Sequence, residues 1–201
     1  GAPYVYFPLH LQPELTTSAV GGAYADQLLA LEALSARMPE GYLIYAKENP
    51  KQTEKQRGPL FYKRLRALKN VRLVPLRESS VELIRGSLAV ATITGTAGWE
   101  ALFHRKPVLV FGSAWYREFP GVTTFTDELN VSEFLRTVAP DEAEIVSFLD
   151  QSLTAAGRGI VDPAYAQLVP GFSDEQNARN VAFSLARHVR ERLGAEQVEA
   201  T

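Results

Sequence analysis

The sequence predicts an α/β fold, in which a Rossmann-like, doubly wound and mostly parallel sheet is flanked by helices and followed by a C-terminal helix. Short runs rich in β-branched and aromatic residues alternate along the chain with longer stretches of helical period. Such alternation is typical of parallel strands joined by helical crossovers. The 201 residues are 46% hydrophobic and 22% charged, which suits one large packed core rather than a disordered chain.

Five strands are expected, and a short sixth is left open at residues 122–125. The five cover residues 4–7, 42–46, 71–75, 88–93 and 108–111. Between them apolar residues recur at helical spacing, as in Gln27–Arg37, where Leu28, Leu31 and Leu34 share one face. The other expected helices cover residues 61–68, 80–85, 98–103, 131–138 and 142–155.

The chain is expected to contain one main domain with an appended arm. Residues 1–156 would form the Rossmann-like domain, and residues 157–201 an arm and helix that pack on the same domain. Ser173 is the expected N-cap of a terminal helix over residues 173–192. The chain starts at Gly1 rather than at a Met, so we expect Gly1 to be a cut point and the natural protein to extend further toward its N-terminus.

Charge and residue content exclude several classes of function. The 21 Lys and Arg stand against 23 Asp and Glu, so the overall charge does not favour a nucleic-acid partner. The absence of Cys removes thiolate metal sites and Cys nucleophiles, and the three His lack zinc-binding spacing. No apolar run approaches the roughly 18–20 residues of a membrane span. We therefore expect no metal, no cofactor and no membrane span, and a cytoplasmic protein for which peripheral association with the inner membrane is left open.

The loop after the first strand carries the first candidate residues. In a doubly wound sheet the ligand crevice lies outside the carboxyl ends of the strands, so the residues after each strand are candidates. Here His10, Gln12 and Glu14 stand at alternate positions. An extended segment would place all three on one side, where they could hold a sugar or a phosphate. The alternative is that His10 satisfies a loop carbonyl while prolines stiffen the turn.

The second strand is followed by Lys47, Glu48, Asn49 and Pro50. A Lys that leaves a buried strand beside an acid and an Asn-Pro turn could reach an anion in the crevice. The alternative is that Lys47 pairs with Glu48 and has no further role.

The fourth strand runs through a turn of small residues into a helix. The free amides around Gly95 and the hydroxyls of Thr94 and Thr96 would form a phosphate cradle at the positive end of a helix dipole. Glu100, about one turn inside the helix, could accept two hydrogen bonds from a ribose diol. The spacing is neither that of a Walker loop nor that of a dinucleotide motif. The alternative is that Gly95 and Gly98 allow tight packing while Glu100 caps the helix end.

Aromatic and basic residues supply the remaining candidates. Trp115 and Tyr116 lie in a glycine-flanked loop after the fifth strand, where they could stack on a base or sugar or form a satellite of the core. The basic residues between Lys51 and Arg66 are expected to form a solvated face, with contact to an anionic lipid or carrier surface as the alternative.

Seven short motifs occur in order over residues 4–122. They are His10-Leu11-Gln12-Pro13-Glu14, Tyr24 with Asp26-Gln27, Lys47-Glu48-Asn49-Pro50, Asn70-Val71, the run from Thr92 to Ala101, Lys106-Pro107-Val108, and Phe111-Gly112 with Trp115-Tyr116. As a set they resemble the C-terminal, donor-binding half of GT-B glycosyltransferases of the bacterial capsule and surface-polysaccharide biosynthesis family, a group that includes Kdo transferases.

The resemblance implies two Rossmann-like domains that face a cleft, of which this chain would supply the nucleotide-sugar-binding one and would lack the N-terminal acceptor domain. It implies transfer of a sugar from a nucleotide donor, with CMP-Kdo as one option, to a glycan or glycolipid acceptor. His10 and Lys47 are then the catalytic candidates, and the substrate-binding candidates are Gln12, Glu14, Asn49, Thr94, Gly95, Thr96, Gly98, Glu100, Trp115 and Tyr116.

A metal-independent reaction is expected, because no DxD-like dyad is evident in the sequence. Hydroxyl groups, backbone amides and Lys47 would then stabilise the departing phosphate. The resemblance implies Lys-Glu-His-Pro in many relatives at the place where this chain has Lys-Glu-Asn-Pro. Asn49 can donate a hydrogen bond but cannot carry a proton or a positive charge. Two other functions stay open: a sugar-nucleotide epimerase, and a noncatalytic module that binds a nucleotide or glycan.

Overall fold

The computed structural model describes residues 1–199, apart from the side chains of Leu15, Thr16, Glu54, Pro163, Ala164 and residues 194–199. The chain divides into two compact units, Gly1–Phe148 and Leu149–Thr201. The boundary falls inside helix α8 (Glu142–Ala155), slightly before the expected domain end at residue 156. That the C-terminal arm packs on the first unit stays a prediction.

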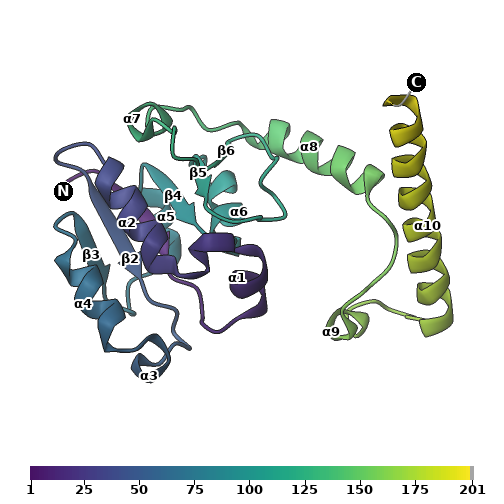
Figure 1. The fold of residues 1–201 in the computed structure, drawn as a ribbon, viewed down its shortest axis with the longest axis horizontal. Helices are drawn as coiled ribbons and strands as arrows, with labels where there is room; N and C mark the ends of the chain where they lie inside the picture. The colour runs from purple at the N-terminus through teal and green to yellow at the C-terminus, as the bar shows by residue number, and fades with distance from the viewer. Residues whose placement is uncertain (200–201) are drawn as a thin grey trace. The chain divides into compact units, whose positions relative to one another are not determined.

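The first unit is built on a six-stranded sheet in which all neighbouring strands are parallel (Figure 1). The strands are β1 (Tyr4–Pro8), β2 (Leu43–Lys47), β3 (Val71–Val74), β4 (Ala89–Thr92), β5 (Val108–Val110) and β6 (Val122–Thr124). Their order, β3-β2-β1-β4-β5-β6, turns back between β1 and β4, as in a doubly wound sheet. The predicted Rossmann-like fold is confirmed, and so is the short sixth strand, which the sequence alone leaves undecided.

One face of the sheet carries the main hydrophobic core. Three helices pack on it: α2 (Gln27–Arg37), α4 (Pro59–Ala67) and α7 (Val131–Phe134). Leu28, Leu31 and Leu34 of α2 are all buried, as their spacing predicts. They share this core with Val5 and Phe7 of β1. Each buried leucine contributes about 1.5–3 kcal/mol to stability, so the helix is fixed by this face.

The other face of the sheet is covered by α5 (Ser80–Gly86) and α6 (Thr96–Phe103). Because side chains alternate along a strand, Tyr4 and Tyr6 of β1 point away from the main core and toward this side. The Tyr4 hydroxyl donates to the carbonyl of Leu83 in α5 (3.0 Å). The helices therefore change sides where β1 meets β4, which is the point at which such sheets bind ligands.

Four short elements lie where the sequence predicts loops. They are α1 (Leu15–Val20), the 3₁₀ helix η1 (Gly22–Ala25), α3 (Glu54–Arg57) and α9 (Pro163–Ala166). Each has four to six residues, too few for a hydrophobic period to be recognised. Helix α7 ends at Phe134 rather than at residue 138.

The second unit contains the end of α8, the short α9 and the long helix α10 (Asp174–Glu199). Ser173 Oγ accepts a hydrogen bond from the Gln176 amide (3.3 Å), so the predicted N-cap is confirmed. The Asn177 side chain exchanges two hydrogen bonds with the backbone of Ile160. These bonds hold the arm along α10.

Candidate active site

Lys47 is the most unusual residue at the strand ends. It ends β2, and it is only 8% exposed. Its Nζ donates to the hydroxyl of Ser80 (2.9 Å), which also accepts from the Tyr6 hydroxyl (3.3 Å). Among the described residues no carboxylate forms an ion pair with Lys47. A buried ammonium that has only a hydroxyl for a partner is poorly compensated, and it is suited to receive an anion.

Glu100 lies near the same cluster. Burial raises the pKa of the Tyr6 hydroxyl, and the negative charge of Glu100 adds to the rise. Glu100 itself is exposed and lies in the second turn of α6. The structure thus keeps its carboxylate open to solvent beside the crevice, and its binding of a ribose stays a prediction.

His10 is buried between β1 and the turn after β4. It is 8% exposed, and its Nε2 lies 2.9 Å from Thr92 Oγ1. Burial, and next the positive charge of Arg57, lower the pKa of His10 to about 4. His10 is therefore neutral at pH 7, so it can exchange hydrogen bonds with a ligand but cannot hold a phosphate by charge.

The low pKa of His10 predicts acid-sensitive stability. The unfolded chain takes up this proton near pH 6.5 and the native state only near pH 4. The stability that the neutral His10 contributes to the native state is therefore fully present above pH 6.5. It is lost as the pH falls from 6.5 to 4, by roughly 3 kcal/mol. Urea unfolding at pH 7 and pH 4.5 should show a smaller loss of stability for His10→Gln than for the parent chain. His104→Gln is the control, and equal losses in all three proteins would contradict the prediction.

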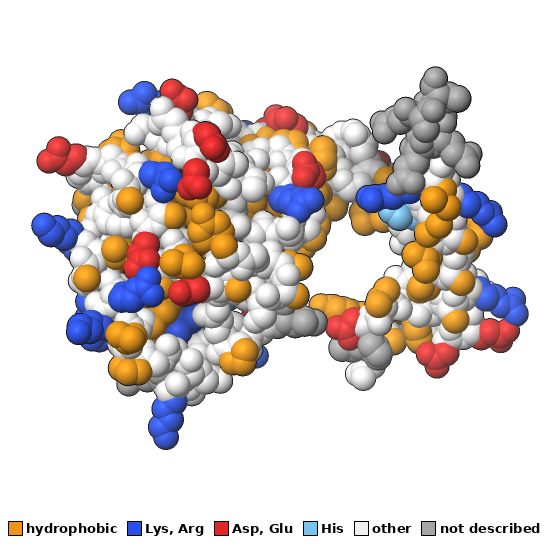
Figure 2. Space-filling view, viewed as in Figure 1, with side chains coloured by type: hydrophobic (Ala, Val, Ile, Leu, Met, Phe, Trp, Pro, Cys, Tyr) orange, Lys and Arg blue, Asp and Glu red, His pale blue; other side chains and the backbone are white. Residues whose placement is uncertain are grey.

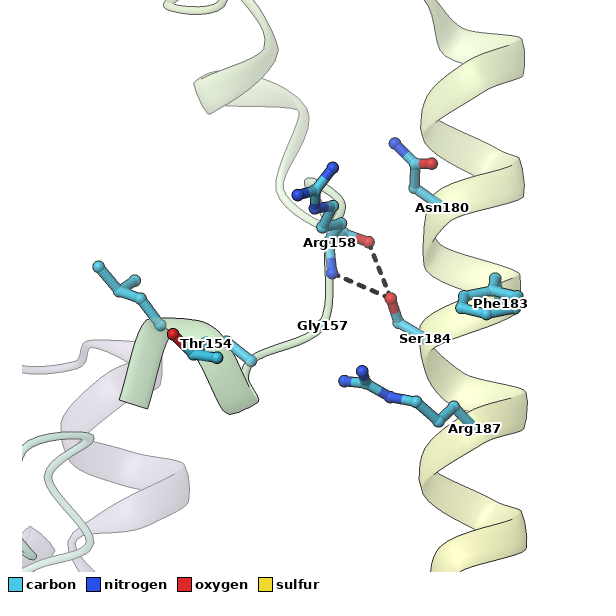
Figure 3. A pocket seen from close by; sticks show the side chains of 9 residues that line it. Thr154, Gly157, Arg158, Asn180, Phe183, Ser184 and Arg187 are labelled. Carbon is cyan, nitrogen blue, oxygen red and sulfur yellow. Dashed lines mark hydrogen bonds between the residues drawn. The ribbon is translucent and has the colours of Figure 1, made fainter. Parts of the chain in front are cut away.

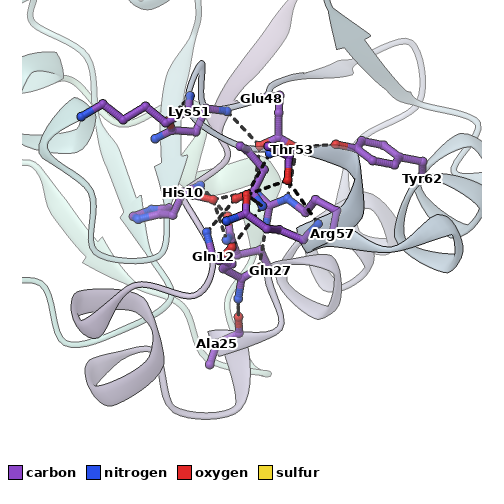
Figure 4. Close-up of polar contacts among 12 residues, drawn as sticks. His10, Gln12, Ala25, Gln27, Glu48, Lys51, Thr53, Arg57 and Tyr62 are labelled. Atoms are coloured by element: carbon purple, nitrogen blue, oxygen red, sulfur yellow. Dashed lines mark hydrogen bonds and ion pairs between the residues drawn. The ribbon is translucent and has the colours of Figure 1, made fainter.

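Arg57 organises the loop that holds His10 (Figure 4). Its side chain is 1% exposed and makes a bidentate ion pair with Glu48, with N–O distances of 2.8 and 3.1 Å. It also donates to the His10 carbonyl and to Oε1 of Gln12. The expectation of a solvated basic face is therefore wrong for Arg57, since it is a buried structural cation.

Two glutamines clamp the same loop. The buried Gln27 side chain accepts from the His10 amide (2.6 Å) and donates to the His10 carbonyl (3.1 Å). Gln52 makes the equivalent pair of bonds with the backbone of Gln12. The Gln12 side chain is itself taken up by Arg57 and by the carbonyl of Ala25. These bonds give Gln12 a structural role. The sequence pattern predicts only the side of the loop on which Gln12 lies, and it does not predict this role.

Glu14 and Asn49 also occupy turn positions. Glu14 is exposed and precedes α1, where its carbonyl accepts from Ser18. Its backbone is extended, and α1 begins directly after it. The Oδ1 of Asn49 accepts from the Lys51 amide (2.9 Å) and closes the turn after β2. Ligand contacts of both residues stay predictions.

Gly95 of the predicted phosphate cradle and Gly98, another substrate-binding candidate, are both close-packed against protein atoms. A Cβ on Gly95 would lie 2.8 Å from Cε1 of His10 and 3.0 Å from Oγ1 of Thr92. A Cβ on Gly98 would meet the Tyr116 hydroxyl and Cγ1 of Val108. Gly98 thus lets α6 approach the sheet, which supports the packing alternative for this residue. A Gly95→Ala substitution would crowd His10. A change in ligand binding in that variant therefore could not be assigned to the ligand contact by itself.

The start of α6 remains open for an anion. Thr96 is exposed at the first position of the helix, while Thr94 is half-buried with its methyl group near Gly112. The first amides of a helix have no intrahelical acceptor, so those of Thr96 and Ala97 face the crevice end with a partial positive charge. That these amides bind a phosphate stays a prediction.

Trp115 and Tyr116 differ sharply in their exposure. Tyr116 is 0% exposed, burial raises the pKa of its hydroxyl, and that hydroxyl donates to the Gly95 carbonyl. It packs against Trp99, whose ring also contacts Phe119, as part of a satellite of the core, so it cannot stack on a ligand in this conformation. Trp115 is 61% exposed and leans on Trp99 with ring centroids 4.8 Å apart. Of these two residues, Trp115 is therefore the one whose ring is exposed, and its stacking on a base or sugar stays a prediction.

One cavity lies next to these strand ends, and another lies away from them in the second unit. One of about 460 Å³ borders the crevice after β5, where the backbone of Gly21 and Gly112 lies beside Tyr24 and Arg117. Another cavity of about 640 Å³ lies within the second unit (Figure 3). It is lined by the end of α8, by Arg158 and by residues of α10 that include Arg187. None of the predicted site residues lines the second cavity. Among the side chains that the structure describes, no three His, Asp or Glu gather as a metal-binding group. In the described part of the chain no helix is long and apolar enough to span a membrane.

The fold and the strand ends define the class of protein: a Rossmann-like α/β domain with a helix start at its switch point and a buried Lys at the end of β2, one strand away. A family model described as capsule polysaccharide biosynthesis protein matches residues 16–156, more than half of the chain. The chain belongs to this family. No curated protein matches it.

Solved structures give the same fold. KpsC of Thermosulfurimonas dismutans, a β-Kdo 2,7 transferase, is similar with a TM-score of 0.52 and 18% identity, over 73% of this chain and 44% of KpsC. The UDP-GlcNAc 2-epimerase of Methanocaldococcus jannaschii, solved with UDP-GlcNAc and UDP, is similar with a TM-score of 0.50 and 11% identity, over 77% of this chain and 46% of the epimerase. The chain thus spans less than half the length of either protein. Identities this low show the fold alone.

Proposed function

We propose that this chain is the donor-binding part of a glycosyltransferase that acts in capsule polysaccharide biosynthesis. The observation that carries the proposal is the buried Lys47, which ends β2, the strand next to the switch point between β1 and β4, and has no carboxylate partner among the described residues. Membership of the capsule family and the fold shared with KpsC support it. By this proposal the ligand is a nucleotide-sugar, and CMP-Kdo is the first donor to test.

The proposed chemistry follows from charge. When a sugar leaves a nucleotide donor, negative charge grows on the departing phosphate. Lys47 supplies a desolvated positive charge for it, and the first amides of α6 supply hydrogen bonds. Glu100 would accept from the ribose hydroxyls, and Trp115 would stack on the base or sugar. Because Lys47 would stabilise the negative charge of the departing phosphate, as a divalent ion does in other glycosyltransferases, we propose a metal-independent reaction.

His10 would act as a neutral imidazole in this scheme. Its Nε2 is engaged with Thr92 Oγ1, which fixes the ring beside the turn that precedes α6. A neutral ring can accept a proton from an acceptor hydroxyl or donate a hydrogen bond to the sugar. The acceptor, a glycan or glycolipid, would be held by a further domain that faces this crevice in a GT-B arrangement, at a cytoplasmic site.

Calorimetric titration with CMP, UDP, CMP-Kdo and UDP-GlcNAc, followed by an assay of donor breakdown, tests the proposal. We expect saturable binding of one nucleotide and of its sugar conjugate, with slow release of free sugar. Conversion of the donor into an epimer would instead support an epimerase function for this chain, whose fold is similar to that of the UDP-GlcNAc 2-epimerase. Binding without any donor breakdown would support a noncatalytic module. The absence of nucleotide binding would refute both the glycosyltransferase and the epimerase and would leave only a module that binds a glycan.

A further inference from the structure

Positive charge is concentrated in one segment of this mildly acidic chain. Residues 51–77 hold nine of the 21 Lys and Arg and a single carboxylate, Glu54. The whole chain carries a net charge of −2, so the remaining residues are strongly acidic in balance. Such an asymmetry marks a surface that meets an anionic partner.

Only part of this charge is neutralised within the structure. Arg57, Arg64 and Arg77 each pair with a Glu. The other six cations form no ion pair with any described carboxylate, and all six are exposed: Lys51, Lys55, Lys63, Arg66, Lys69 and Arg72. Their charge is therefore available to a partner.

The outer side of α4 gathers these cations around an exposed leucine. Helix α4 buries Phe61 and Leu65 against the core, so Lys63 and Arg66 project from its opposite side together with Leu60, which is 65% exposed. Lys55 and Arg66 also line a hollow of about 390 Å³ beside Tyr62. We call Lys55, Leu60, Lys63 and Arg66 the basic face.

The basic face lies along one margin of the first unit. Figure 2 shows Lys and Arg side chains with hydrophobic side chains among them where Figure 1 draws α3 and α4. The same elements reach the crevice, because Arg57 of α3 donates to the His10 carbonyl and to Gln12. A partner on the basic face would therefore lie next to the strand ends.

We infer that the basic face docks the protein on an anionic lipid bilayer. Lys55, Lys63 and Arg66 would meet the phosphates of the headgroups, each strengthening binding about fivefold. Leu60 would enter the boundary between headgroups and acyl chains, which a fully hydrated polyanion does not offer. This docking would bring the crevice to an acceptor that is carried in the membrane. The inference stands on the charge and exposure of α3 and α4, and it does not depend on the proposed glycosyl transfer.

Co-sedimentation of the full chain with vesicles tests the inference. We expect binding to vesicles of phosphatidylglycerol and phosphatidylcholine and none to phosphatidylcholine alone, with loss of binding at about 1 M salt, where the Debye length is about 3 Å. The double variant Lys63→Gln with Arg66→Gln should bind about 25-fold more weakly. Leu60→Ser should weaken binding roughly five- to tenfold without any change of charge.

A matched control removes the same charge from other surfaces. Arg85→Gln with Arg136→Gln, both exposed and outside α3 and α4, should bind vesicles within about twofold of the parent chain. An equal loss in both double variants, or equal binding to both kinds of vesicle, would overturn the inference. Dextran sulfate serves as a soluble polyanion. Binding to it that depends on Lys63 and Arg66 but not on Leu60, without vesicle binding, would overturn the bilayer as the partner.

Discussion

Replacement of Arg57 by Ala is expected to lower the free energy of unfolding by about 3–5 kcal/mol, measured by urea denaturation at pH 7. The Arg57 side chain is 1% exposed and that of Glu48 is 11% exposed, so the pair is shielded from water. Removal of the guanidinium would leave the Glu48 carboxylate buried, with the Tyr62 hydroxyl and the Asn49 amide as its remaining donors among the described residues. A buried charge without its counter-charge is more costly than the lost contacts alone.

The chain offers a matched control for this substitution. Arg64 and Glu32 form a bidentate pair of similar length, with Nη2 and Oε2 2.7 Å apart, but their side chains are 44% and 32% exposed. Arg64→Ala should therefore cost about 1 kcal/mol or less. If Arg57→Ala and Arg64→Ala destabilise the protein equally, burial does not govern the pair and the structural role of Arg57 is refuted.

Arg57→Lys separates charge from geometry. Lysine keeps the positive charge but cannot bond Glu48, Gln12 and the His10 carbonyl at once, because it lacks the planar fork. An intermediate loss of stability is expected. The loop after β1 should also become less ordered, which would appear as faster amide exchange at the backbone of Gln12.

The sheet could be predicted from sequence because its signals are local. Each strand is a short apolar run, and Leu28, Leu31 and Leu34 mark α2 by their spacing alone. Parallel order then follows from the crossovers, and it places the carboxyl ends of β1, β2 and β4 together. The position of the α6 start at the switch point, and that of Lys47 at the end of the strand beside it, are consequences of this topology.

The roles of single side chains at the site could not be predicted, because they depend on contacts distant in sequence. Arg57 lies in a helix of four residues, and its partners His10 and Gln12 are more than 40 residues away. Gly98 resembles a ligand-binding glycine in the sequence, yet the atoms nearest to its missing Cβ belong to Tyr116 and Val108. In each case the burial that decides the role exists only once the sheet has formed.

Replacement of Lys47 by Met is expected to weaken nucleotide binding by roughly 2–5 kcal/mol, about 30-fold to several-thousandfold in Kd, because a desolvated charge that meets a phosphate would be lost. Without ligand the same substitution should leave stability unchanged or raise it by about 1–3 kcal/mol. The ammonium is buried, and its only hydrogen-bond partner among the described residues is the Ser80 hydroxyl, so its removal relieves a desolvation cost. Titration calorimetry and urea unfolding on the same preparation measure both quantities.

Lys106→Met is the control for Lys47→Met. Lys106 is half-buried and its Nζ donates to one oxygen, the Ser87 carbonyl (2.7 Å), but it precedes β5 and so lies at the opposite edge of the sheet from the crevice. Its loss should leave nucleotide affinity unchanged. Lys47→Arg keeps the charge and should retain part of the affinity. If Lys47→Met instead lowers stability and leaves affinity intact, the ammonium serves the fold, and the anion must be bound by the amides of α6 alone.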